Sequence, residues 1–454
     1  MDNTVSQEKQ AFYQKLGEIA GTSNVLTGEK ATACYTVDGI TPQAIVHPAS
    51  TEQVANIVRA ANESRITLVP WGSGSKQQIG PCLEAADTML CLGNMNQIVE
   101  LDASNFSVQV QAGIVNGELQ KQLAEKNLFF PLDPLYMETS TIGGEIATNS
   151  SGPRQFMYST VRDLVLGVTV VSPTGDIIHT GGKTMKNVAG IDLCRMYIGS
   201  WGTLGVITEA VLRLFPLPEA SAGLYITFND AEDAFRMVGQ LLNSPLTPSA
   251  IEFLDSVAGH SVAETLGSGL NDGDALLIVN AEGTRGDVAR HCQDVSALAK
   301  TNKAKTIMAL EDEKAFPAWM AYRGVQGAML GANHSIVQGK AAVPISKLGD
   351  MVQQVKKISA SHSVKIGLTA HCGNGILYTY LAEEHEALLR ITDELKRAAA
   401  SLNGFFLIEL APLSVRKEID ILPPRNDYPL MRRLKAEFDP NNILNRGRLV
   451  GGLG

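Results

Sequence analysis

The stretch from Ser140 to Gly152 reads STIGGEIATNSSG, a run of small and hydroxyl-bearing residues with one charge. Two other stretches have the same character: PWGSGSK from Pro70 to Lys76, and GSWGTLGVIT from Gly199 to Thr208. Small residues let backbone N–H groups approach an anion, and hydroxyl groups add donors. For any one loop alone a tight turn is the simpler alternative, and the first loop is neither a P-loop nor a G-x-G-x-x-G motif. Together the three loops predict a cradle for a large ligand that carries a pyrophosphate.

The composition is that of a folded protein with an unusual amount of glycine. Of the 454 residues, 44% are hydrophobic, 19% are charged and 42 are glycine. A chain of this length is expected to form two to four domains. The net charge of −9 argues against nucleic acid as a partner.

Neither the N-terminus nor any apolar run resembles a targeting or membrane-spanning segment. The first residues lack the basic start and apolar run of a secretory signal, and no eighteen consecutive residues are apolar. The six cysteines form no C-x-x-C pair, so we expect no thiolate-bound zinc and no iron–sulfur cluster in this chain. Scattered cysteines of this kind indicate reduced core residues and a cytoplasmic setting.

Strand and helix patterns divide the chain at Phe215–Pro218. Before it, strands and helices alternate, with a capping box at Ser50–Gln53 and a helix that we expect Asn116 to cap. After it, the pattern has the spacing of a ferredoxin-like α+β sheet with helices on one face. The predicted domains are 1–218, 219–424 and a C-terminal segment, 425–454, that returns to the first domain.

Further motifs make the sequence similar to a known family. With the first two loops, VRDLVLGV (161–168) resembles the vanillyl-alcohol oxidase/p-cresol methylhydroxylase superfamily. GKTMKNVAGIDL (182–193) with the third loop, and then GPR (152–154) with the closing FDPNNILNRGR (438–448), narrow this resemblance to one part of the superfamily. Within it the sequence resembles the glycolate oxidase/D-lactate dehydrogenase branch, and most of all the smaller FAD-binding subunit of bacterial glycolate oxidase. The resemblance implies an α+β fold: a two-subdomain FAD-binding domain of the p-cresol methylhydroxylase type and a ferredoxin-like α+β cap domain.

The resemblance also implies which residues hold FAD. The first loop would wrap the pyrophosphate, the second would line the flavin side, and Asn445 would face the flavin from the C-terminal return. No histidine stands in the first loop, where members with covalent flavin carry one, so non-covalent FAD is implied. The implied cofactor-binding residues are Trp71, Gly72, Ser73, Gly74, Ser75, Lys76, Pro134, Thr141, Gly143, Gly144, Ala147, Thr148, Ser151, Gly152, Val206, Ile207 and Asn445.

Two segments depart from the pattern of the substrate-oxidising relatives. Those relatives carry H-x-G-D-G-N-x-H, with two metal ligands, and a later E-H-G with a third ligand and the catalytic base. Here the first motif reads HCGNGILY from His371 to Tyr378, and Glu409 is followed by leucine. One histidine, one carboxylate and a tyrosine are a poor set of metal ligands, so we expect no metal. His371 is then either a base for the substrate hydroxyl or a hydrogen-bonded histidine in a turn.

The candidate catalytic residues are therefore His371, Glu409 and Arg323. Arg323 ends the run WMAYR, which resembles an L-W-x-x-R segment whose arginine binds substrate carboxylate in relatives. A guanidinium group pairs with carboxylate through two hydrogen bonds. A helix-surface arginine is the alternative.

Two functions follow from the resemblance. In the first, the chain is an FAD-dependent dehydrogenase of a small 2-hydroxy acid such as glycolate or D-lactate. Its electrons would pass to an iron–sulfur subunit, alongside a second flavoprotein subunit, and any membrane association would go through a partner. In the alternative, the chain is an FAD-holding or electron-transfer subunit, and a sister subunit oxidises the substrate.

Overall fold

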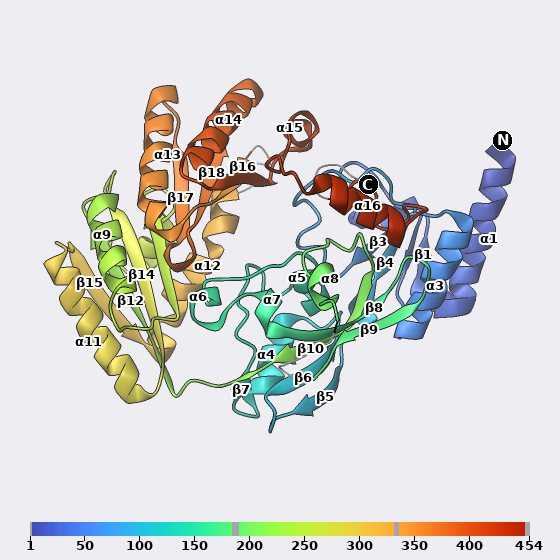
Figure 1. Ribbon diagram of the computed structural model, residues 1–454, viewed down its shortest axis with the longest axis horizontal. Helices are drawn as coiled ribbons and strands as arrows, with labels where there is room; N and C mark the ends of the chain where they lie inside the picture. Colours follow the sequence, from blue (N-terminus) through green and yellow to red (C-terminus); the bar gives the residue numbers. More distant parts are fainter. Residues whose placement is uncertain (1, 184–189, 331–335, 450–454) are drawn as a thin grey trace. The chain divides into compact units, whose positions relative to one another are not determined.

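The computed structural model describes residues 2–183, 190–330 and 336–449, and these form two compact units (Figure 1). Unit 1 comprises the described residues of 1–152, 159–217 and 424–454, and unit 2 comprises 153–158 and 218–423. The short segment Pro153–Tyr158 thus groups with unit 2, although it lies inside the range predicted for the first domain. The described residues after Pro424 group with unit 1.

One sheet of unit 1 carries the strand that leads into the first glycine loop. The helix α3 (Thr51–Ser64) follows its second strand, and Ser50 caps α3 by accepting a hydrogen bond from the Gln53 N–H at 3.2 Å. The apolar face of α3 packs with α1 (Asp2–Ala20) in the core of the unit. The strand order is β1 (Val25–Thr27), β2 (Ala44–Val46), β4 (Thr88–Cys91), β3 (Leu68–Trp71), with β4 parallel to both β2 and β3.

The other main sheet of unit 1 is antiparallel and shares that core. Its order is β5 (Ile98–Asp102), β6 (Ser107–Gln111), β10 (Val206–Arg213), β8 (Val165–Val171), β9 (Ile177–Gly181). A further pair joins β7 (Leu128–Phe129) to β11 (Phe215–Pro216). The shorter helices are α2 (Glu29–Thr32), α4 (Asn116–Ala124), α5 (Ile142–Ala147), α7 (Val161–Leu164) and α8 (Cys194–Tyr197).

The expectation that Asn116 caps a helix is wrong. Val115 occupies the cap position of α4, and Asn116 is the first helical residue. The Asn116 side chain is fully buried and donates to the Leu132 carbonyl and to both carboxylate oxygens of Glu145. Asn116 therefore satisfies a buried carboxylate instead of the helix N-terminus.

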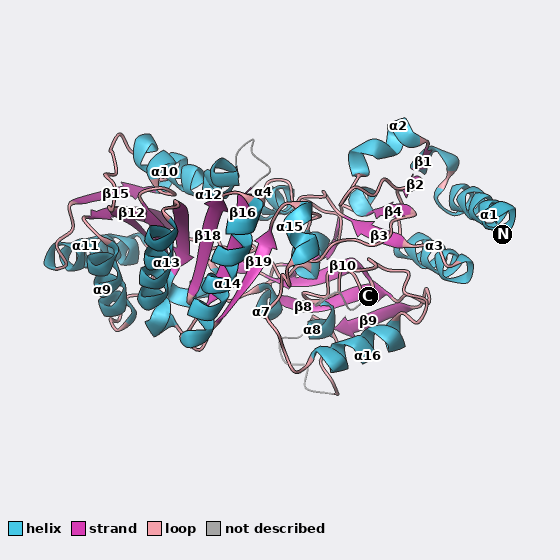
Figure 2. Ribbon diagram, turned by 90° about the horizontal axis from the view of Figure 1, so that it is seen from above, coloured by secondary structure: helices cyan, strands magenta, loops and turns pink. Residues whose placement is uncertain are grey.

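Unit 2 is built on one antiparallel sheet (Figure 2). Alternate side chains on each strand face opposite sides of the sheet. Helices α9 (Ala231–Leu242), α11 (Arg285–Thr301), α13 (Leu348–His362) and α14 (His385–Ser401) cover one side. The strand order is β15 (Thr306–Glu311), β12 (Ala220–Phe228), β14 (Ala275–Gly283), β13 (Ala250–Asp255), β17 (Ile366–His371), β18 (Ile376–Ala382), β16 (Ile336–Ala342), β19 (Phe405–Leu410).

The prediction of helices on one face only is wrong. Helices α10 (His260–Thr265) and α12 (Phe316–Leu330) pack on the other face, over an apolar cluster that includes Tyr225, Leu254 and Ile278. Sequence patterns missed both helices and strand β16. Beyond that cluster, the face covered by α10 and α12 is polar, and the functional candidates of unit 2 lie there. The remaining helices are α6 (Gln155–Tyr158) and α15 (Leu413–Glu418).

The C-terminal segment is attached to unit 1 at strand β3. After α16 (Tyr428–Phe438), Leu444 bridges to Leu68 in parallel, and the Asn445 N–H donates to the Leu68 carbonyl at 3.0 Å. Lys435 fixes the return from inside: its buried ammonium donates to Asp439 Oδ2 at 2.6 Å and to the carbonyls of Thr203 and Leu444.

Candidate active site

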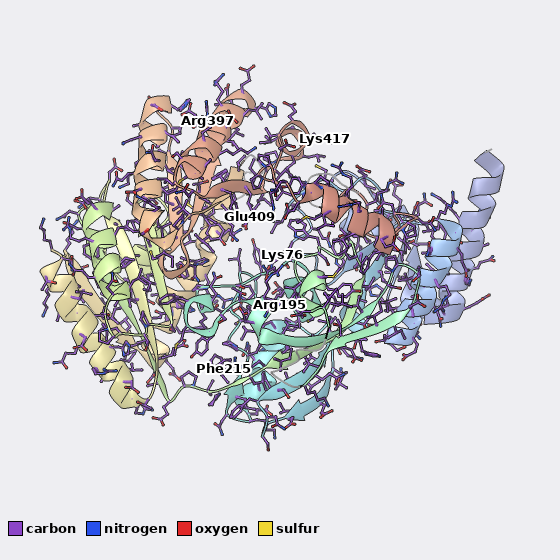
Figure 3. All side chains as sticks on the ribbon, viewed as in Figure 1. Lys76, Arg195, Phe215, Arg397, Glu409 and Lys417 are labelled. Atoms are coloured by element: carbon purple, nitrogen blue, oxygen red, sulfur yellow. The ribbon has the colours of Figure 1, made fainter. Side chains whose placement is uncertain are left out.

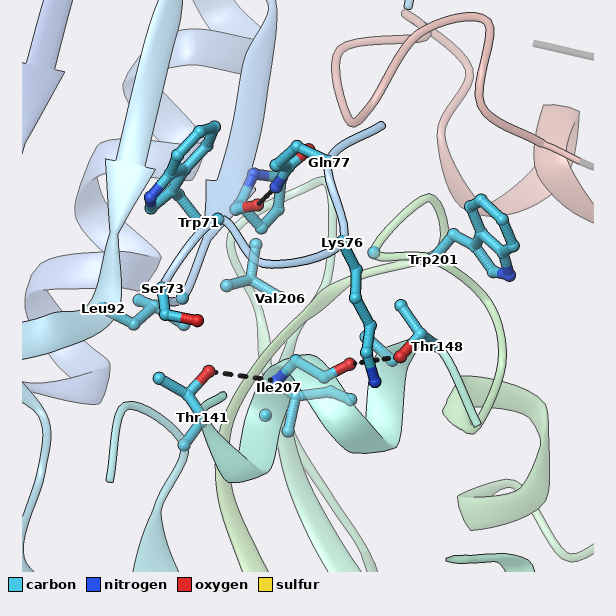
Figure 4. Close-up of a pocket in the computed structure, with 18 of the residues that line it drawn as sticks. Trp71, Ser73, Lys76, Gln77, Leu92, Thr141, Thr148, Trp201, Val206 and Ile207 are labelled. Carbon is cyan, nitrogen blue, oxygen red and sulfur yellow. Dashed lines mark hydrogen bonds between the residues drawn. The ribbon is translucent and has the colours of Figure 1, made fainter. Parts of the chain in front are cut away.

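Unit 1 contains an open pocket at the end of β3 (Figure 4). Its volume is about 820 Å³, including the space that opens to solvent. All three glycine-rich loops line it. The predicted residues in its lining are Trp71, Gly72, Ser73, Gly74, Ser75, Lys76, Thr141, Gly143, Gly144, Ala147, Thr148, Val206, Ile207 and Asn445.

The first loop uses glycine where no side chain fits. A Cβ at Gly72 would lie 2.1 Å from Thr141 Oγ1, and one at Gly74 would lie 2.3 Å from the Trp71 ring. Gly74 also has a φ of +78°, which L-residues rarely adopt. Within the described residues, the N–H groups of Ser73, Gly74 and Ser75 have no acceptor. The loop therefore presents backbone donors to the pocket.

Hydrogen bonds of side chains hold the second loop in place. Thr141 caps the short helix α5 by accepting from the Gly144 N–H at 3.3 Å, and Thr148 Oγ1 donates to the Gly144 carbonyl at 2.8 Å (Figure 4). Glu145, on the buried side of α5, accepts from Asn116 and from the Ser140 hydroxyl. Lys76 reaches across from the first loop and donates to the Ser150 hydroxyl. The two loops are thus joined by direct contacts.

Asn445 and Arg448 bring the C-terminal segment to the same pocket. Asn445 Nδ2 donates to the Trp201 carbonyl at 2.6 Å, while its buried Oδ1 has no partner within the described residues. The Arg448 guanidinium donates to the carbonyls of Gln77 and Ile79 and so fixes the exit of the first loop. Sequence reasoning missed Arg448 as a lining residue. It also missed Gln77, Leu92 and Ala112, whereas Pro70, Ser140, Trp201, Gly202 and Gly205 lie within the three predicted loops but were not among the named cofactor-binding residues.

Pro134, Ser151 and Gly152 are not among the lining residues of this pocket in the described part of the chain. Ser151 Oγ instead accepts from the Val161 N–H at 3.2 Å. A Cβ at Gly152 would lie 1.9 Å from the Asp133 carbonyl oxygen, so close backbone packing explains this glycine. The motif 182–193 includes residues 184–189, which lie outside the described residues.

Unit 2 holds a polar cluster around His371, at the end of β17. Glu252 lies opposite His371 on β13, and its Oε2 is 2.7 Å from His371 Nδ1. Tyr322, from α12, donates its hydroxyl to the same oxygen. Only 1% of Glu252 and 8% of His371 is exposed. Since a carboxylate only accepts hydrogen bonds, His371 donates this bond from Nδ1, and in the neutral imidazole Nε2 is then an acceptor.

The cluster continues across β18, β16 and β19. The His371 and Tyr378 rings meet edge to face at 5.4 Å, and Lys340 Nζ lies 5.6 Å from the Tyr378 ring centroid. Lys340 Nζ is also 3.3 Å from Oε1 of Glu409, near the end of β19 (Figure 3), and Gln338 donates to Glu409 Oε2 at 3.1 Å. The cluster thus links His371 and Glu409 through Tyr378 and Lys340.

Charge and burial set the protonation of two members of this cluster. Burial raises the pKa of the Tyr378 phenol to about 12, although the neighbouring Lys340 ammonium lowers it. For Lys340, burial lowers the pKa but Tyr378 and Glu409 raise it by more, and the net direction is upward. At neutral pH the phenol is therefore neutral and the amine is charged.

Arg323 follows Tyr322 on α12 and is partly exposed. Successive helical residues point about 100° apart, so the hydrogen bond of Tyr322 to Glu252 does not fix the direction of Arg323. Sequence reasoning missed Glu252, Tyr322 and Lys340. Only the alternation along β13 and β16, once the faces of these strands are known, distinguishes Glu252 and Lys340 from surface charges.

Family models cover both parts of this chain. An FAD binding domain matches residues 42–181, and the C-terminal domain of FAD linked oxidases matches 217–409 and 415–449. The chain belongs to the FAD-linked oxidases: it is an oxidoreductase that binds FAD. Both the family and the fold class expected from the sequence are confirmed.

Curated relatives are similar over nearly the whole length. The glycolate oxidase subunit GlcD of Bacillus subtilis is 31% identical and is aligned over 96% of each chain. A D-lactate dehydrogenase of Anaerostipes hadrus is 28% identical over 96% of this chain and 97% of its own. Among solved structures, p-cresol methylhydroxylase has a TM-score of 0.78 at 16% identity, over 97% of this chain and 96% of its own. Within the described residues, no helix is long and apolar enough to cross a bilayer.

The pocket fits FAD on its own chemistry. The unpaired N–H groups of the first loop suit a pyrophosphate, because backbone donors without partners bind anions well. The buried, unpartnered Oδ1 of Asn445 suits a ligand N–H or O–H group. The lining between them is largely apolar or small, as a flat aromatic ring system requires.

Proposed function

We propose that this chain is an FAD-dependent dehydrogenase of a small 2-hydroxy acid, such as glycolate or D-lactate. The observation that carries the proposal is the His371–Glu252 pair, a histidine held by a buried carboxylate in a chain that binds FAD. The relatives named glycolate oxidase subunit and D-lactate dehydrogenase support this substrate class.

In this proposal His371 takes the hydroxyl proton of the substrate on Nε2. Glu252 holds the imidazole through Nδ1–H and stabilises the positive charge that proton transfer creates, and Tyr322 holds Glu252 in place. Bound FAD supplies the acceptor for the hydride from the substrate carbon, so that the product is a 2-oxo acid. Arg323 pairs with the substrate carboxylate, as a guanidinium does through two hydrogen bonds, and Glu409 orients the surrounding polar groups.

The remaining features of the proposal concern FAD and the electron partner. The described lining residues of the pocket include no histidine, which supports non-covalent binding of FAD. The six cysteines are free thiols without cluster-ligand spacing, so the electrons leave to an iron–sulfur subunit or another acceptor. A second flavoprotein subunit belongs to the same proposed complex. We place the protein in the cytoplasm. Any association with a membrane would be made through a partner protein.

A second candidate function rests on the departures from the motif of substrate-oxidising relatives. Tyr378 and Asn374 stand where those relatives are expected to carry histidine and aspartate, and no histidine follows Glu409. In this alternative the chain is an FAD-holding or electron-transfer subunit, and a sister subunit oxidises the hydroxy acid.

Anaerobic reduction of the bound flavin separates the two functions. The purified chain is mixed with glycolate, D-lactate or, as a stereochemical control, L-lactate, and flavin absorbance is followed in a stopped-flow instrument. Full bleaching by glycolate or D-lactate, slowed at least about 100-fold in His371→Asn, supports the dehydrogenase. If no 2-hydroxy acid bleaches the flavin of the isolated chain while dithionite does, the subunit function holds instead.

A further inference from the structure

The resemblance described above implies a divalent metal in substrate-oxidising relatives, held by residues that correspond to His371, Tyr378 and Glu409. The residues of this chain do not fit a metal. Tyr378 stands where a ligand histidine is implied, so one histidine and one carboxylate remain, whereas zinc normally takes three or four N, S or O ligands. Within the described residues, no group of three or more His, Cys, Asp or Glu side chains has the arrangement to hold a metal ion.

A protein cation already occupies the place beside Glu409. The Lys340 ammonium lies 3.3 Å from Glu409 Oε1 and over the Tyr378 ring, 5.6 Å from its centroid. The other carboxylate oxygen of Glu409 accepts from the Gln338 amide. Lys340 and Glu409 are largely buried, with 27% and 21% of their side chains exposed. A metal on Glu409 would sit about 2 Å from a carboxylate oxygen, where the ammonium would repel it.

We propose that Lys340 supplies in this chain the positive charge that a divalent metal supplies in relatives with the intact motif, so that the site works without a metal. The ammonium compensates Glu409 and faces the aromatic ring that replaces a ligand histidine. The proposal goes beyond the proposed function, since it concerns the electrostatics of the site whether or not a hydroxy acid is the substrate. Its alternative is an ordinary ion pair between β16 and β19.

Metal binding measured directly, without substrate, tests this. The FAD-loaded chain is dialysed against chelator and titrated with Zn²⁺ and with Mn²⁺ by calorimetry, and bound metal is counted by elemental analysis. We expect no stoichiometric site in the parent protein. A tight site for either ion, or flavin reduction that is lost with chelator and restored by metal, would overturn the proposal.

A gain of metal binding gives the sharper result. In the double variant Lys340→Met/Tyr378→His the ammonium is removed and an imidazole is introduced beside His371 and Glu409. We expect it to bind one Zn²⁺ per chain, at least 100-fold more tightly than the parent. The matched control Lys340→Met/Tyr378→Phe removes the same charge but adds no ligand, and we expect no binding.

The remaining outcomes are also decisive. If the first double variant keeps its flavin and its circular dichroism spectrum but binds no Zn²⁺, Lys340 is an ordinary ion pair. If it does not retain its flavin, the single variant Tyr378→His is titrated, and zinc binding with Lys340 still present contradicts the proposal. Failure of every hydroxy acid to reduce the flavin, with the metal results as expected, overturns only the proposed function.

Discussion

Glu252 and His371 lie opposite each other on strands β13 and β17, and Glu252 Oε2 is 2.7 Å from His371 Nδ1. The pairing of two strands in the centre of the sheet fixes this relationship. A slip of either strand by one residue would turn one side chain to the opposite face. The strand register therefore places the two side chains opposite each other on the same face of the sheet.

Glu252→Gln should slow flavin reduction by on the order of 10- to 100-fold, because the amide no longer compensates a protonated imidazole. Tyr322→Phe should have a smaller effect of a few fold, since it removes one hydrogen bond to the same oxygen. Stopped-flow reduction at saturating substrate measures both. A Glu252→Gln protein that reduces its flavin at the parental rate would show that the pair is only structural.

Gly72→Ala should abolish tight FAD binding. Its Cβ would lie 2.1 Å from Thr141 Oγ1, so either the first loop or the cap of α5 must move. The flavin content of the purified protein and the fluorescence of released FAD measure the loss. Gly93→Ala is the matched control, because a Cβ at Gly93 meets nothing within 4 Å. Equal loss in both variants would contradict the role assigned to the first loop.

Lys435→Met should destabilise unit 1 by about 3–5 kcal/mol, because it leaves the buried Asp439 carboxylate without its cation. Chemical denaturation followed by circular dichroism gives the change in the free energy of unfolding. Arg432→Met, an exposed position on the same helix, should change it by less than about 0.5 kcal/mol. A Lys435→Met protein as stable as the control would refute this account of the C-terminal return.

Because of Asp255, the free energy of unfolding should fall as the pH rises. Burial raises the pKa of its carboxyl to about 6, although the Ala258 N–H donates to it at 2.8 Å, and the unfolded value is about 4. The folded state therefore holds the proton more tightly. The stabilising contribution of Asp255 is complete below about pH 4 and is lost as pH rises through 6.

Asp255→Asn keeps an oxygen acceptor but removes this titration. Relative to the parent, its melting temperature should therefore be higher at about pH 8 than at about pH 4, by the equivalent of at most about 3 kcal/mol. Thermal denaturation at both pH values measures the difference. If the melting temperatures of the variant and the parent differ by the same amount at both pH values, Asp255 is charged throughout this range.

One of the six thiols should react rapidly with a disulfide reagent in the native protein. Cys34 is exposed, Cys82 and Cys292 are partly buried, and Cys91, Cys194 and Cys372 are buried. Burial raises the pKa of Cys91 to about 12 and that of Cys194 to about 11, which suppresses the reactive thiolate. Cys34→Ser should remove the rapid phase, and its persistence would contradict this assignment.

The pocket of unit 1 was predictable as a pocket because its signal is local. Gly72 and Gly74 lie close together in the first loop, and the hydroxyl-bearing Thr141 and Thr148 lie close together in the second. The composition of these loops differs from that of ordinary turns. Residues that reach the pocket singly carry no such signal. Leu92 and Ala112 lie outside the three loops, and Arg448 contributes one guanidinium group; only the folded chain brings these residues to the pocket.

The polar face of unit 2 was less predictable, because its members are spread over several strands and one helix. His371 and Glu409 were found from their similarity to motifs, and their catalytic roles stay predictions. Glu252 and Lys340 alternate with apolar residues, as surface strand residues also do. The prediction for Asn116 was wrong for a related reason. An asparagine at the start of a helix resembles a cap, and only the folded chain shows that its partner is the buried carboxylate of Glu145.

The attachment of the C-terminal segment to β3 sets the order in which the protein acquires its cofactor. The Arg448 guanidinium donates a hydrogen bond to the carbonyl of Ile79, which lies 369 residues earlier in the chain. During synthesis the first loop therefore emerges long before the residues that complete its pocket exist. A complete pocket is then available to FAD only after Asn445 and Arg448 have been synthesised, so a product interrupted before Asn445 would bind free flavin poorly.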